Sequence, residues 1–353
     1  MRVVVDALWL PDGPPSGRMV VREMVAAWLR EHPGDDLVLV VHDQHVADVA
    51  AEFTSATVVG TSLRLHPLVN AVTLPRVARR SGADLVVTQN FAPLSKRVPS
   101  AVFVHDVLFQ TNPRWFTRSE RLYLSLIPML LTRATTVMTS SANEANRILA
   151  HNPGVSAVDP VGLGIAAALT GRAPAEPVDG LIPDRFLLAV GRLNVRKNLA
   201  TTIEAAVGSG AATVERPLIV VGEASGREEH LSEAVLASVA SGSVQFLGGV
   251  SDAQLRWLYE HCRLFVFMSL DEGWGLPPIE AVSLGAPVLV SDRPVFRETL
   301  GAAATYAPPR DVAEIGRTMM TLLTAARRTQ TALPPERTSW TRLVETAREA
   351  AAS

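Results

Sequence analysis

Short apolar segments alternate with stretches of helical periodicity along the chain, and this alternation most restricts its fold. Strands that are apolar at every position indicate sheets covered on both faces, and intervening helices predict parallel, doubly wound α/β domains. The strands fall into two series, so we expect two domains. They comprise residues 3–7, 37–41, 85–88, 101–104 and 136–139, then 186–190, 218–221, 244–246, 264–267 and 288–290. The expected helices include residues 18–30, 118–132, 142–149, 198–207 and 252–261.

The expected boundary between the two domains has the composition of a linker. Pro174, Pro177, Gly180 and Pro183 lie close together between two predicted strands. We therefore expect an N-terminal domain over residues 1–171, a linker over 172–184 and a second domain over 185–333. Residues 334–353 are expected to add a C-terminal helix.

The composition is typical of a compact soluble enzyme, with 48% hydrophobic and 19% charged residues. A formal net charge of −2 argues against nucleic acid as a partner. The single cysteine, Cys262, excludes an intramolecular disulfide and fits the cytosol. The first apolar run breaks at Asp6, so we expect a strand there rather than a signal peptide. These observations predict a cytoplasmic protein.

Peripheral contact with the inner face of the membrane stays open. The longest apolar stretch, residues 122–131, is shorter than the ~20 residues that span a bilayer. Two groups of arginines could form basic faces for such contact, and the alternative is that they are ordinary solvated helix faces. The groups are Arg76, Arg79 and Arg80, and Arg114, Arg118 and Arg121.

Two carboxylates eight positions apart, Glu272 and Glu280, follow one strand of the second series. The first lies on a glycine-bracketed loop, and the second about one turn into the helix expected over residues 279–284. Free N–H groups at a helix N-terminus attract anions, while carboxylates suit a ligand with hydroxyl groups. Together they describe a nucleotide sugar. The alternatives are turn formation at Asp271-Glu272-Gly273 and compensation of the helix dipole by Glu280.

Arg192 and Lys197 are the candidate phosphate ligands. They lie five positions apart in a loop between a strand and a helix, and guanidinium and ammonium groups both bind phosphate oxygens. The alternative is a pair of surface cations. We expect them to replace a metal ion, because no Asp-x-Asp motif ends an N-terminal strand. His42 and His45 have no matching ligand cluster, so no metal site is expected.

Four candidate residues, His105, Arg192, Gly222 and Glu272, lie at or just past the end of a predicted strand. Open parallel sheets bind ligands beyond the carboxyl ends of their strands. This placement favours one cleft between the two domains. A dinucleotide-binding site is excluded, because no Gly-x-Gly-x-x-Gly follows the first strand.

Three segments resemble motifs of the retaining glycosyltransferases of family 4, also called glycosyl transferases group 1. Residues 271–292 resemble the family's Glu-x7-Glu segment, and residues 188–199 resemble its Gly-Arg-Leu…Lys-Asn signature. Val104-His105-Asp106 with residues 112–116 is similar to its His-Asp loop. The resemblance covers nearly the entire chain and is strongest over residues 186–292. It implies the GT-B fold, with two Rossmann-like domains, a cleft between them and a C-terminal helix that packs back on the N-terminal domain.

The resemblance also implies roles for individual residues. Glu280 would bind the ribose hydroxyls, and Glu272 and His105 would contact the donor sugar. The implied catalytic residues are His105, Arg192, Lys197 and Glu272. The implied donor-binding residues are Gly222, Val250, Gly273, Trp274, Gly275, Leu276 and Glu280. No side-chain nucleophile is implied, and the sugar would keep its anomeric configuration.

On the acceptor side the sequence departs from the family pattern. The N-terminal glycine loop, usually Gly-Gly-Ile-Gly, reads Gly13-Pro14-Pro15-Ser16-Gly17-Arg18, and residues 161–164 lack the usual asparagine. Gly17 and Asp106 are the acceptor-side candidates, and Asp106 could also fix the tautomer of His105. The acceptor therefore stays open among saccharide, lipid-linked and natural-product hydroxyls.

The predicted function is a retaining, metal-independent transfer of a hexose from a nucleotide sugar, with no further cofactor. GDP-mannose is the first expectation for the donor, because residues 105–121 are similar to mannosyltransferases of polysaccharide assembly. The alternatives are another GT-B enzyme, such as a nucleotide-sugar epimerase or a phosphorylase, and a non-catalytic subunit that binds nucleotide sugars. The oligomeric state stays open.

Overall fold

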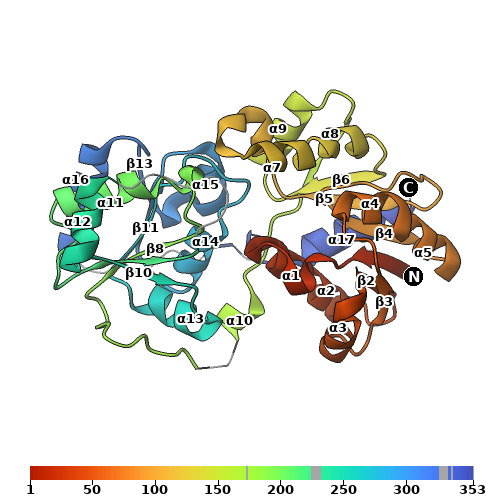
Figure 1. The fold of residues 1–353 in the computed structure, drawn as a ribbon, viewed down its shortest axis with the longest axis horizontal. Coiled ribbons are helices and arrows are strands. Elements are labelled where there is room, and N and C mark those ends of the chain that lie inside the picture. The colour runs from red at the N-terminus through yellow and green to blue at the C-terminus, as the bar shows by residue number, and fades with distance from the viewer. Residues whose placement is uncertain (172–173, 224–231, 326–332, 335–336, 353) are drawn as a thin grey trace. The chain divides into compact units, whose positions relative to one another are not determined.

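A computed structural model describes residues 1–353 except 172–173, 224–231, 326–332, 335–336 and 353 (Figure 1). The chain divides into two compact units. Unit 1 comprises Met1–Thr111, Arg118–Gly164 and Ser339–Ser353, and unit 2 comprises Asn112–Thr117 and Ile165–Thr338. The division at residue 164 precedes the expected boundary, so the described part of the expected linker falls inside unit 2.

The sheet of unit 1 has seven strands in the order β3-β2-β1-β4-β5-β6-β7, and all neighbours are parallel. They are β1 (Arg2–Asp6), β2 (Asp36–His42), β3 (Thr57–Thr61), β4 (Leu85–Gln89), β5 (Ser100–Val104), β6 (Thr136–Thr139) and β7 (Asp159–Pro160). The five predicted strands are confirmed. The edge strands β3 and β7 were not predicted, because β3 contains Gly60 and is only partly buried, and β7 has only two residues.

Helices cover both faces of this sheet, since alternate strand residues point to opposite sides and all of β4 and β5 is buried. On one face, Val4, Val38 and Val86 form a core cluster with Leu74 and Ala78 of α5. The helices of unit 1 are α1 (Trp9–Asp12), α2 (Pro15–Glu31), α3 (Val46–Glu52), α4 (His66–Leu68), α5 (Leu74–Ser81), α6 (Leu108–Thr111), α7 (Arg118–Leu124), α8 (Leu126–Leu131), α9 (Ala142–His151) and α17 (Thr341–Glu349).

The prediction of a single helix over residues 118–132 is wrong in one respect. Two helices, α7 and α8, occupy this segment and are separated at Ser125. Pro128 explains the break. Proline has no backbone N–H for the helical bond to Leu124, and it is tolerated in the first turn of a new helix.

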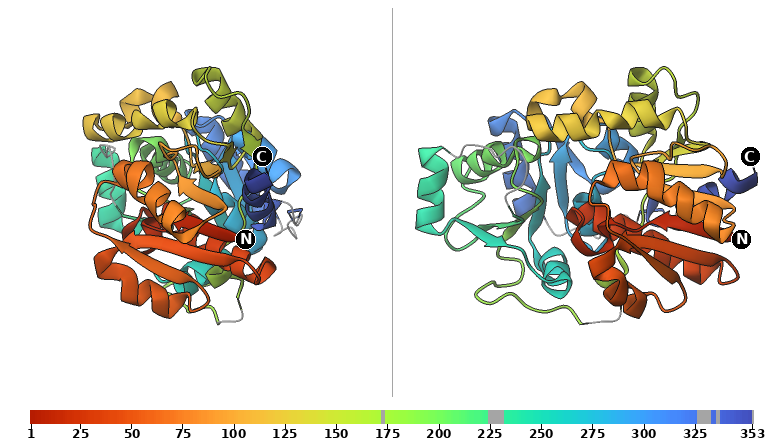
Figure 2. Two further views of the ribbon diagram at one scale, coloured as in Figure 1. Left: turned by 90° about the vertical axis from the view of Figure 1, so that its right-hand side faces the viewer. Right: turned by 45° about the vertical axis from the view of Figure 1, so that its right-hand side comes forward.

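Helix α17 brings the end of the chain onto unit 1. It contacts α2, β5 and β6, and Figures 1 and 2 show it (blue) beside α2 (red). Leu343, Val344 and Ala347 are buried in this contact. At its edge, Glu345 pairs with His32 (2.8 Å) and Arg348 pairs with Asp35 (2.9 Å). The described C-terminal residues thus complete unit 1.

The sheet of unit 2 has six parallel strands in the order β10-β9-β8-β11-β12-β13. They are β8 (Leu187–Val190), β9 (Leu218–Val221), β10 (Val244–Gly248), β11 (Leu264–Phe267), β12 (Val288–Ser291) and β13 (Thr305–Ala307). The five predicted strands are confirmed, and the three-residue edge strand β13 was not predicted. Cys262 is buried and forms no disulfide.

The helices of unit 2 are α10 (Ala167–Thr170), α11 (Leu199–Gly208), α12 (Glu233–Ser241), α13 (Asp252–His261), α14 (Leu276–Ser283), α15 (Pro294–Leu300) and α16 (Val312–Thr324). Leu187, Ala189, Val220 and Val266 of the sheet form its main core with Ile203 of α11. None of the helices in the described part of the chain combines the length and apolarity that crossing a bilayer requires.

Candidate functional site

The loop after β8 is fixed by two asparagines. The side chain of Asn194 accepts a hydrogen bond from the backbone N–H of Lys197 (3.3 Å) and caps the short 3₁₀ turn Val195–Lys197. Asn198 has a left-handed backbone (φ 55°), which asparagine tolerates better than most residues. Its Nδ2 donates to the backbone oxygens of Met268 (3.1 Å) and Pro309 (2.6 Å). This loop is therefore tied to the carboxyl end of β11.

Glu272, in the loop after β11, joins the two loops through its carboxylate. Its Oε1 accepts hydrogen bonds from Nζ of Lys197 (2.6 Å) and from the hydroxyl of Ser269 (2.7 Å). Its Oε2 accepts one from Nη1 of Arg196 (2.9 Å). The glutamate side chain is 8% exposed, and those of Arg196 and Lys197 are 13% and 14% exposed. The result is a buried ion network at the carboxyl ends of β8 and β11.

Electrostatics keep this network ionised over most of the neutral range. Burial alone would raise the pKa of Glu272, but the charges of Arg196 and Lys197 and the hydrogen bonds from Lys197 and Ser269 lower it to about 2. Burial lowers the pKa of Lys197 to about 8, with Arg196 and Arg192 also lowering it and Glu272 opposing the shift. The influence of Arg192 on Lys197 shows that these two cations are close enough to repel one another.

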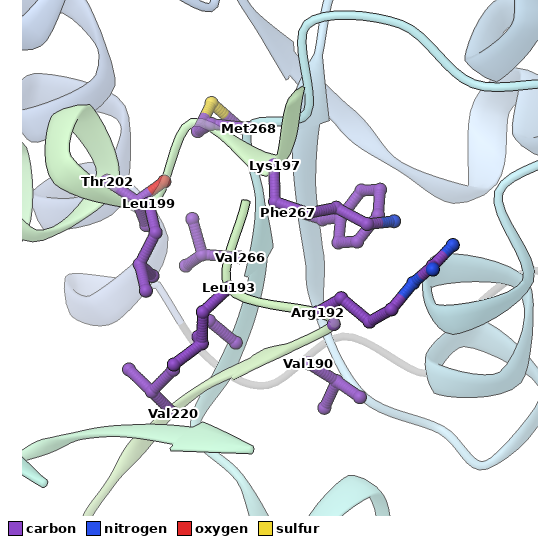
Figure 3. A pocket seen from close by; sticks show the side chains of 12 residues that line it. Val190, Arg192, Leu193, Lys197, Leu199, Thr202, Val220, Val266, Phe267 and Met268 are labelled. Atoms are coloured by element: carbon purple, nitrogen blue, oxygen red, sulfur yellow. The ribbon is translucent and has the colours of Figure 1, made fainter. Parts of the chain in front are cut away.

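Arg192 and Lys197 line one pocket of unit 2 (Figure 3). Their cationic ends reach toward the same side, and Nζ of Lys197 lies 4.6 Å from the centre of the Phe267 ring. The rest of the labelled lining is mainly apolar and comes from Val190, Leu193, Leu199, Val220, Val266 and Met268. The two predicted phosphate ligands therefore lie in one pocket at the carboxyl ends of β8 and β11.

Gly222, at the end of β9, allows the loops after β8 and β9 to approach closely. A Cβ atom there would overlap the backbone oxygen of Gly191, and the φ of 143° is one that side chains disfavour. The backbone N–H of Gly222 donates a hydrogen bond to the backbone oxygen of Gly248 (2.9 Å). Val250 lies just before the capping box of Ser251 and Gln254 that starts α13.

Glu280 lies one turn into α14 and is 8% exposed. Its Oε2 accepts a hydrogen bond from the hydroxyl of Tyr259 on α13 (2.9 Å). Burial raises the pKa of Glu280 to about 7, the hydrogen bond from Tyr259 opposes this shift, and Asp252 adds to it. The carboxyl group therefore titrates close to neutrality.

The turn before α14 differs in one respect from the expected anion site. Gly275 has φ 90°, and a Cβ atom there would lie 2.6 Å from the ring of Phe296, so glycine is required. The helix begins at Leu276, earlier than expected, and its next two residues are prolines without N–H groups. Buried Gly273 and Trp274 precede this turn. The Trp274 Nε1 group is buried and has no hydrogen-bond partner among the described residues.

His105 lies in unit 1, at the end of β5. Its Nε2 bonds to Oε1 of Gln89 (2.9 Å), and its ring packs against Trp9 and Phe103, with centroids 5.0 and 4.9 Å away. Burial and the neighbouring His66 lower the pKa of His105 to about 3. The imidazole is therefore neutral, and because an amide oxygen only accepts, Nε2 carries the proton and Nδ1 is the acceptor.

Gly17 is not in a loop, because α2 begins at Pro15 and includes it. A Cβ atom on Gly17 would lie 2.6 Å from the ring of Trp9, so this glycine makes room for the tryptophan that packs on His105. Oδ1 of Asp106 accepts a hydrogen bond from the backbone N–H of Leu108 (3.2 Å).

A buried polar network beside His105 was not predicted. Oδ2 of Asp6 accepts hydrogen bonds from Nε2 of His66 (2.6 Å) and Nδ2 of Asn70 (2.9 Å), and Nδ1 of His66 bonds to the hydroxyl of Tyr123 (3.1 Å). Burial would raise the pKa of Asp6, but His66, Asn70 and the backbone N–H of Leu8 lower it overall. Only the position of Asp6 at the end of the first predicted strand could have indicated this network.

Within the described residues, the one group of carboxylate and histidine side chains close enough for a metal ion is Glu31, His32 and Glu345. It lies where α2 meets α17. Nε2 of His45 forms a hydrogen bond with Oδ2 of Asp12 (2.6 Å).

The sequence analysis did not identify three residues of the site, Arg196, Ser269 and Tyr259. Arg196 could have been identified, because it adjoins Lys197 within the Gly-Arg-Leu…Lys-Asn signature.

Residues 179–333 match the family model described as Glycosyl transferases group 1. Three curated bacterial mannosyltransferases are similar. They are serotype-specific mannosyltransferase WbdA of Escherichia coli (35% identity over 40% of this chain and 18% of WbdA), O-antigen chain mannosyltransferase B of Escherichia coli (29% over 59% and 57%) and O-antigen chain mannosyltransferase RfbU of Salmonella typhimurium (36% over 36% and 35%). The matched segments thus span less than two thirds of these relatives.

Solved structures are similar over both units. WaaG, a glycosyltransferase involved in lipopolysaccharide biosynthesis, matches 100% of this chain and 95% of its own, with TM-score 0.64 and 17% identity. Anabaena HepE in complex with UDP and glucose matches 100% and 99%, with TM-score 0.66 and 16% identity. At such identities the likeness establishes the fold, which is GT-B, with two parallel-sheet α/β domains.

Proposed function

Residues 179–333 belong to the glycosyl transferases group 1 family, and from this premise we propose that the chain is a retaining hexosyltransferase that uses a nucleotide sugar without a metal ion. The observation that carries the proposal is the ion network of Arg196, Lys197 and Glu272 beside Arg192. Mannose from GDP-mannose is the proposed transfer, because the curated relatives named above are mannosyltransferases.

The charge of the network suits a diphosphate leaving group. Three cations, Arg192, Arg196 and Lys197, face one carboxylate, Glu272, so the formal sum of +3 and −1 is +2. As the bond from the sugar to the diphosphate breaks, negative charge grows on the phosphate oxygens. Fixed cations in a partly buried site stabilise that charge without reorganising. Trp274 Nε1, Glu272 and Glu280 then remain to bind hydroxyl groups of the sugar and ribose.

The direct test is calorimetric titration with GDP-mannose, GDP, UDP-glucose and UDP, followed by proton NMR of any product formed with candidate saccharide acceptors. We expect GDP-mannose to bind more tightly than UDP-glucose and the product to keep the α-configuration of the donor. A β-linked product would contradict retention. Preference for UDP-glucose would overturn the proposed donor but leave the reaction class in place.

Activity is expected to persist in excess EDTA, because Arg192 and Lys197 supply the positive charge that a divalent ion supplies in other enzymes. The measurement is release of GDP before and after chelation, with Mg²⁺ and Mn²⁺ added back separately. Loss of activity on chelation and recovery with either ion would show that a metal site completes the leaving-group stabilisation.

Nucleotide affinity is expected to pass through a maximum between about pH 7 and about pH 8. Ribose hydroxyls donate to a carboxylate, so binding favours ionised Glu280, and affinity should rise as the pH increases through about 7. Lys197 must keep its proton to bind phosphate, so affinity should fall as the pH increases through about 8. Calorimetric Kd values for GDP over this pH range check both the rise in affinity and its fall. Titrations in two buffers measure the number of protons released on binding.

Two variants test whether Glu280 causes the rise of nucleotide affinity through about pH 7. Glu280→Gln should abolish this rise, because the amide does not titrate. Tyr259→Phe should move it to higher pH, because the tyrosine hydroxyl lowers the pKa of Glu280. A parent protein whose Kd is constant from about pH 6 to about pH 8 would contradict the role of Glu280 in nucleotide binding.

A further inference from the structure

Gln89 is a fully buried glutamine at the carboxyl end of β4. Its Oε1 accepts a hydrogen bond from Nε2 of His105 (2.9 Å), whereas its own Nε2 is buried without a partner among the described residues. An unpaired buried amide lowers stability, and an apolar side chain of similar size would avoid that cost. Packing alone therefore does not explain a glutamine at this position, but its bond to His105 does.

The same strand end fixes the rest of His105. Gln89 pairs with Phe103 across β4 and β5, and His105 lies two residues beyond Phe103. Asn90, which has a left-handed backbone (φ 62°), accepts a hydrogen bond at Oδ1 from the backbone N–H of His105 (3.1 Å). The rings of Trp9 and Phe103 pack on the imidazole. One amide side chain thus holds the ring of His105, and its neighbour holds the main chain.

The buried network of Asp6 and Asn70 in turn holds the main chain of Gln89. Oδ2 of Asp6 accepts a hydrogen bond from the backbone N–H of Gln89 (3.3 Å), and Nδ2 of Asn70 donates to its backbone oxygen (3.4 Å). Asn70 also donates to Asp6 (2.9 Å). The network therefore fixes the strand end from which Gln89 reaches the imidazole.

This arrangement leaves Nδ1 of His105 available to a ligand. Nε2 carries the proton, and Nδ1 has no hydrogen-bond partner among the described residues and is not enclosed. Burial and His66 lower the pKa of His105 to about 3, so the ring is neutral around neutral pH. A neutral nitrogen with a free lone pair accepts a hydrogen bond from a hydroxyl group, and it does not attract phosphate.

We propose that Gln89 is the positioning residue of His105 and orients its ring so that Nδ1 accepts a hydrogen bond from a sugar hydroxyl. Asp106 was expected to fix the tautomer, but the bond to the ring comes from Gln89. That the hydroxyl belongs to a substrate of hexosyl transfer rests on the proposed function. The tautomer of His105 and its dependence on Gln89 do not.

The first test is NMR of the full chain labelled with ¹⁵N at its eight histidines. Imidazole signals that disappear in His105→Gln belong to His105. In the parent we expect the Nε2–H tautomer, with a proton that exchanges slowly with water. In Gln89→Met we expect fast exchange of that proton and a mixture of both tautomers, because the acceptor is gone. An Nδ1–H tautomer in the parent, or an unchanged spectrum in Gln89→Met, would overturn the proposal.

The second test separates positioning from a structural role. Gln89→Met should keep the Tm of the parent or raise it, because methionine occupies a similar volume without an unpaired amide. Its Kd for GDP should be unchanged, since GDP carries no hexose. If the hydroxyl is that of the donor, the Kd for GDP-mannose should rise about tenfold. If it is that of the acceptor, the KM for methyl α-mannoside should rise instead by a similar factor.

A matched control makes the same substitution in unit 2. Gln245 on β10 is half-buried and donates from Nε2 to the backbone oxygen of Gly242 (3.3 Å). Gln245→Met should leave the His105 spectrum and both substrate constants unchanged. Equal losses in the two variants, or a Gln89→Met protein that loses stability but keeps both constants, would overturn the positioning role. A parent that binds neither GDP nor GDP-mannose would overturn the proposed transfer, while the NMR result would still decide the role of Gln89.

Discussion

Replacement of Lys197 by alanine is expected to lower kcat by about 10²–10³-fold with a much smaller change in KM. The ammonium group lines the pocket beside Arg192, where charge on the leaving diphosphate would be greatest in the transition state. The fold should survive, because Glu272 keeps its hydrogen bonds from Arg196 and Ser269. Initial rates of GDP release at varied GDP-mannose concentrations would measure both constants.

Two further variants control this experiment. Lys197→Arg keeps the charge and should recover part of kcat. Arg317→Ala removes an exposed cation that pairs with Glu314 on α16 and should leave both constants unchanged. If the Lys197→Ala protein turns over within a few-fold of the parent, this lysine does not stabilise the leaving group.

Gly222→Ala is expected to lower the free energy of unfolding of unit 2 by about 3 kcal/mol. Its Cβ atom would overlap a backbone oxygen of Gly191, which cannot rotate away as a side chain can. The left-handed φ adds to the cost. Because Gly191 leads into the loop of Arg192 and Lys197, we also expect weaker nucleotide binding. Urea unfolding followed by circular dichroism, with and without GDP, measures both effects.

Glycines elsewhere in unit 2 separate the two causes. Gly242 has φ 85° but open space at its Cβ position, so Gly242→Ala should cost only about 1 kcal/mol through the backbone. Gly208, at the end of α11, has neither feature, and Gly208→Ala should be neutral or slightly stabilising. Equal losses for Gly222→Ala and Gly242→Ala would show that the overlap with Gly191 relaxes without cost.

Central strands could be predicted from the sequence, because burial on both faces leaves continuous apolar runs such as those of β8 and β11. Edge strands could not. β3 is only partly buried, and β7 is too short to show any period. Pro128 indicates the break between α7 and α8. The residues on both sides of it are apolar, and this continuous apolar pattern led to the prediction of a single helix.

The site was predictable where its residues adjoin in sequence. Arg192 and Lys197 share a loop, and Glu272 and Glu280 share a loop and the helix that follows it. Partnerships across the fold were not predictable, because Arg196 and Glu272 are 76 residues apart and Asp6 and His66 are 60 residues apart. The pairing of β8 with β11 brings Arg196 to Glu272, and the helix α4, in the connection between β3 and β4, brings His66 to Asp6 at the end of β1.

The packing of α17 on α2 also bears on how the protein is synthesised. Residues 165–338 leave the ribosome before residues 339–352, so unit 2 has all the residues it requires while unit 1 still lacks its last helix. Until then, the apolar surfaces of α2, β5 and β6 that α17 later covers stay open, although most of unit 1 was translated first. Unit 1 can therefore complete its core only after the residues of unit 2 have been translated, although most of unit 1 precedes them in the sequence.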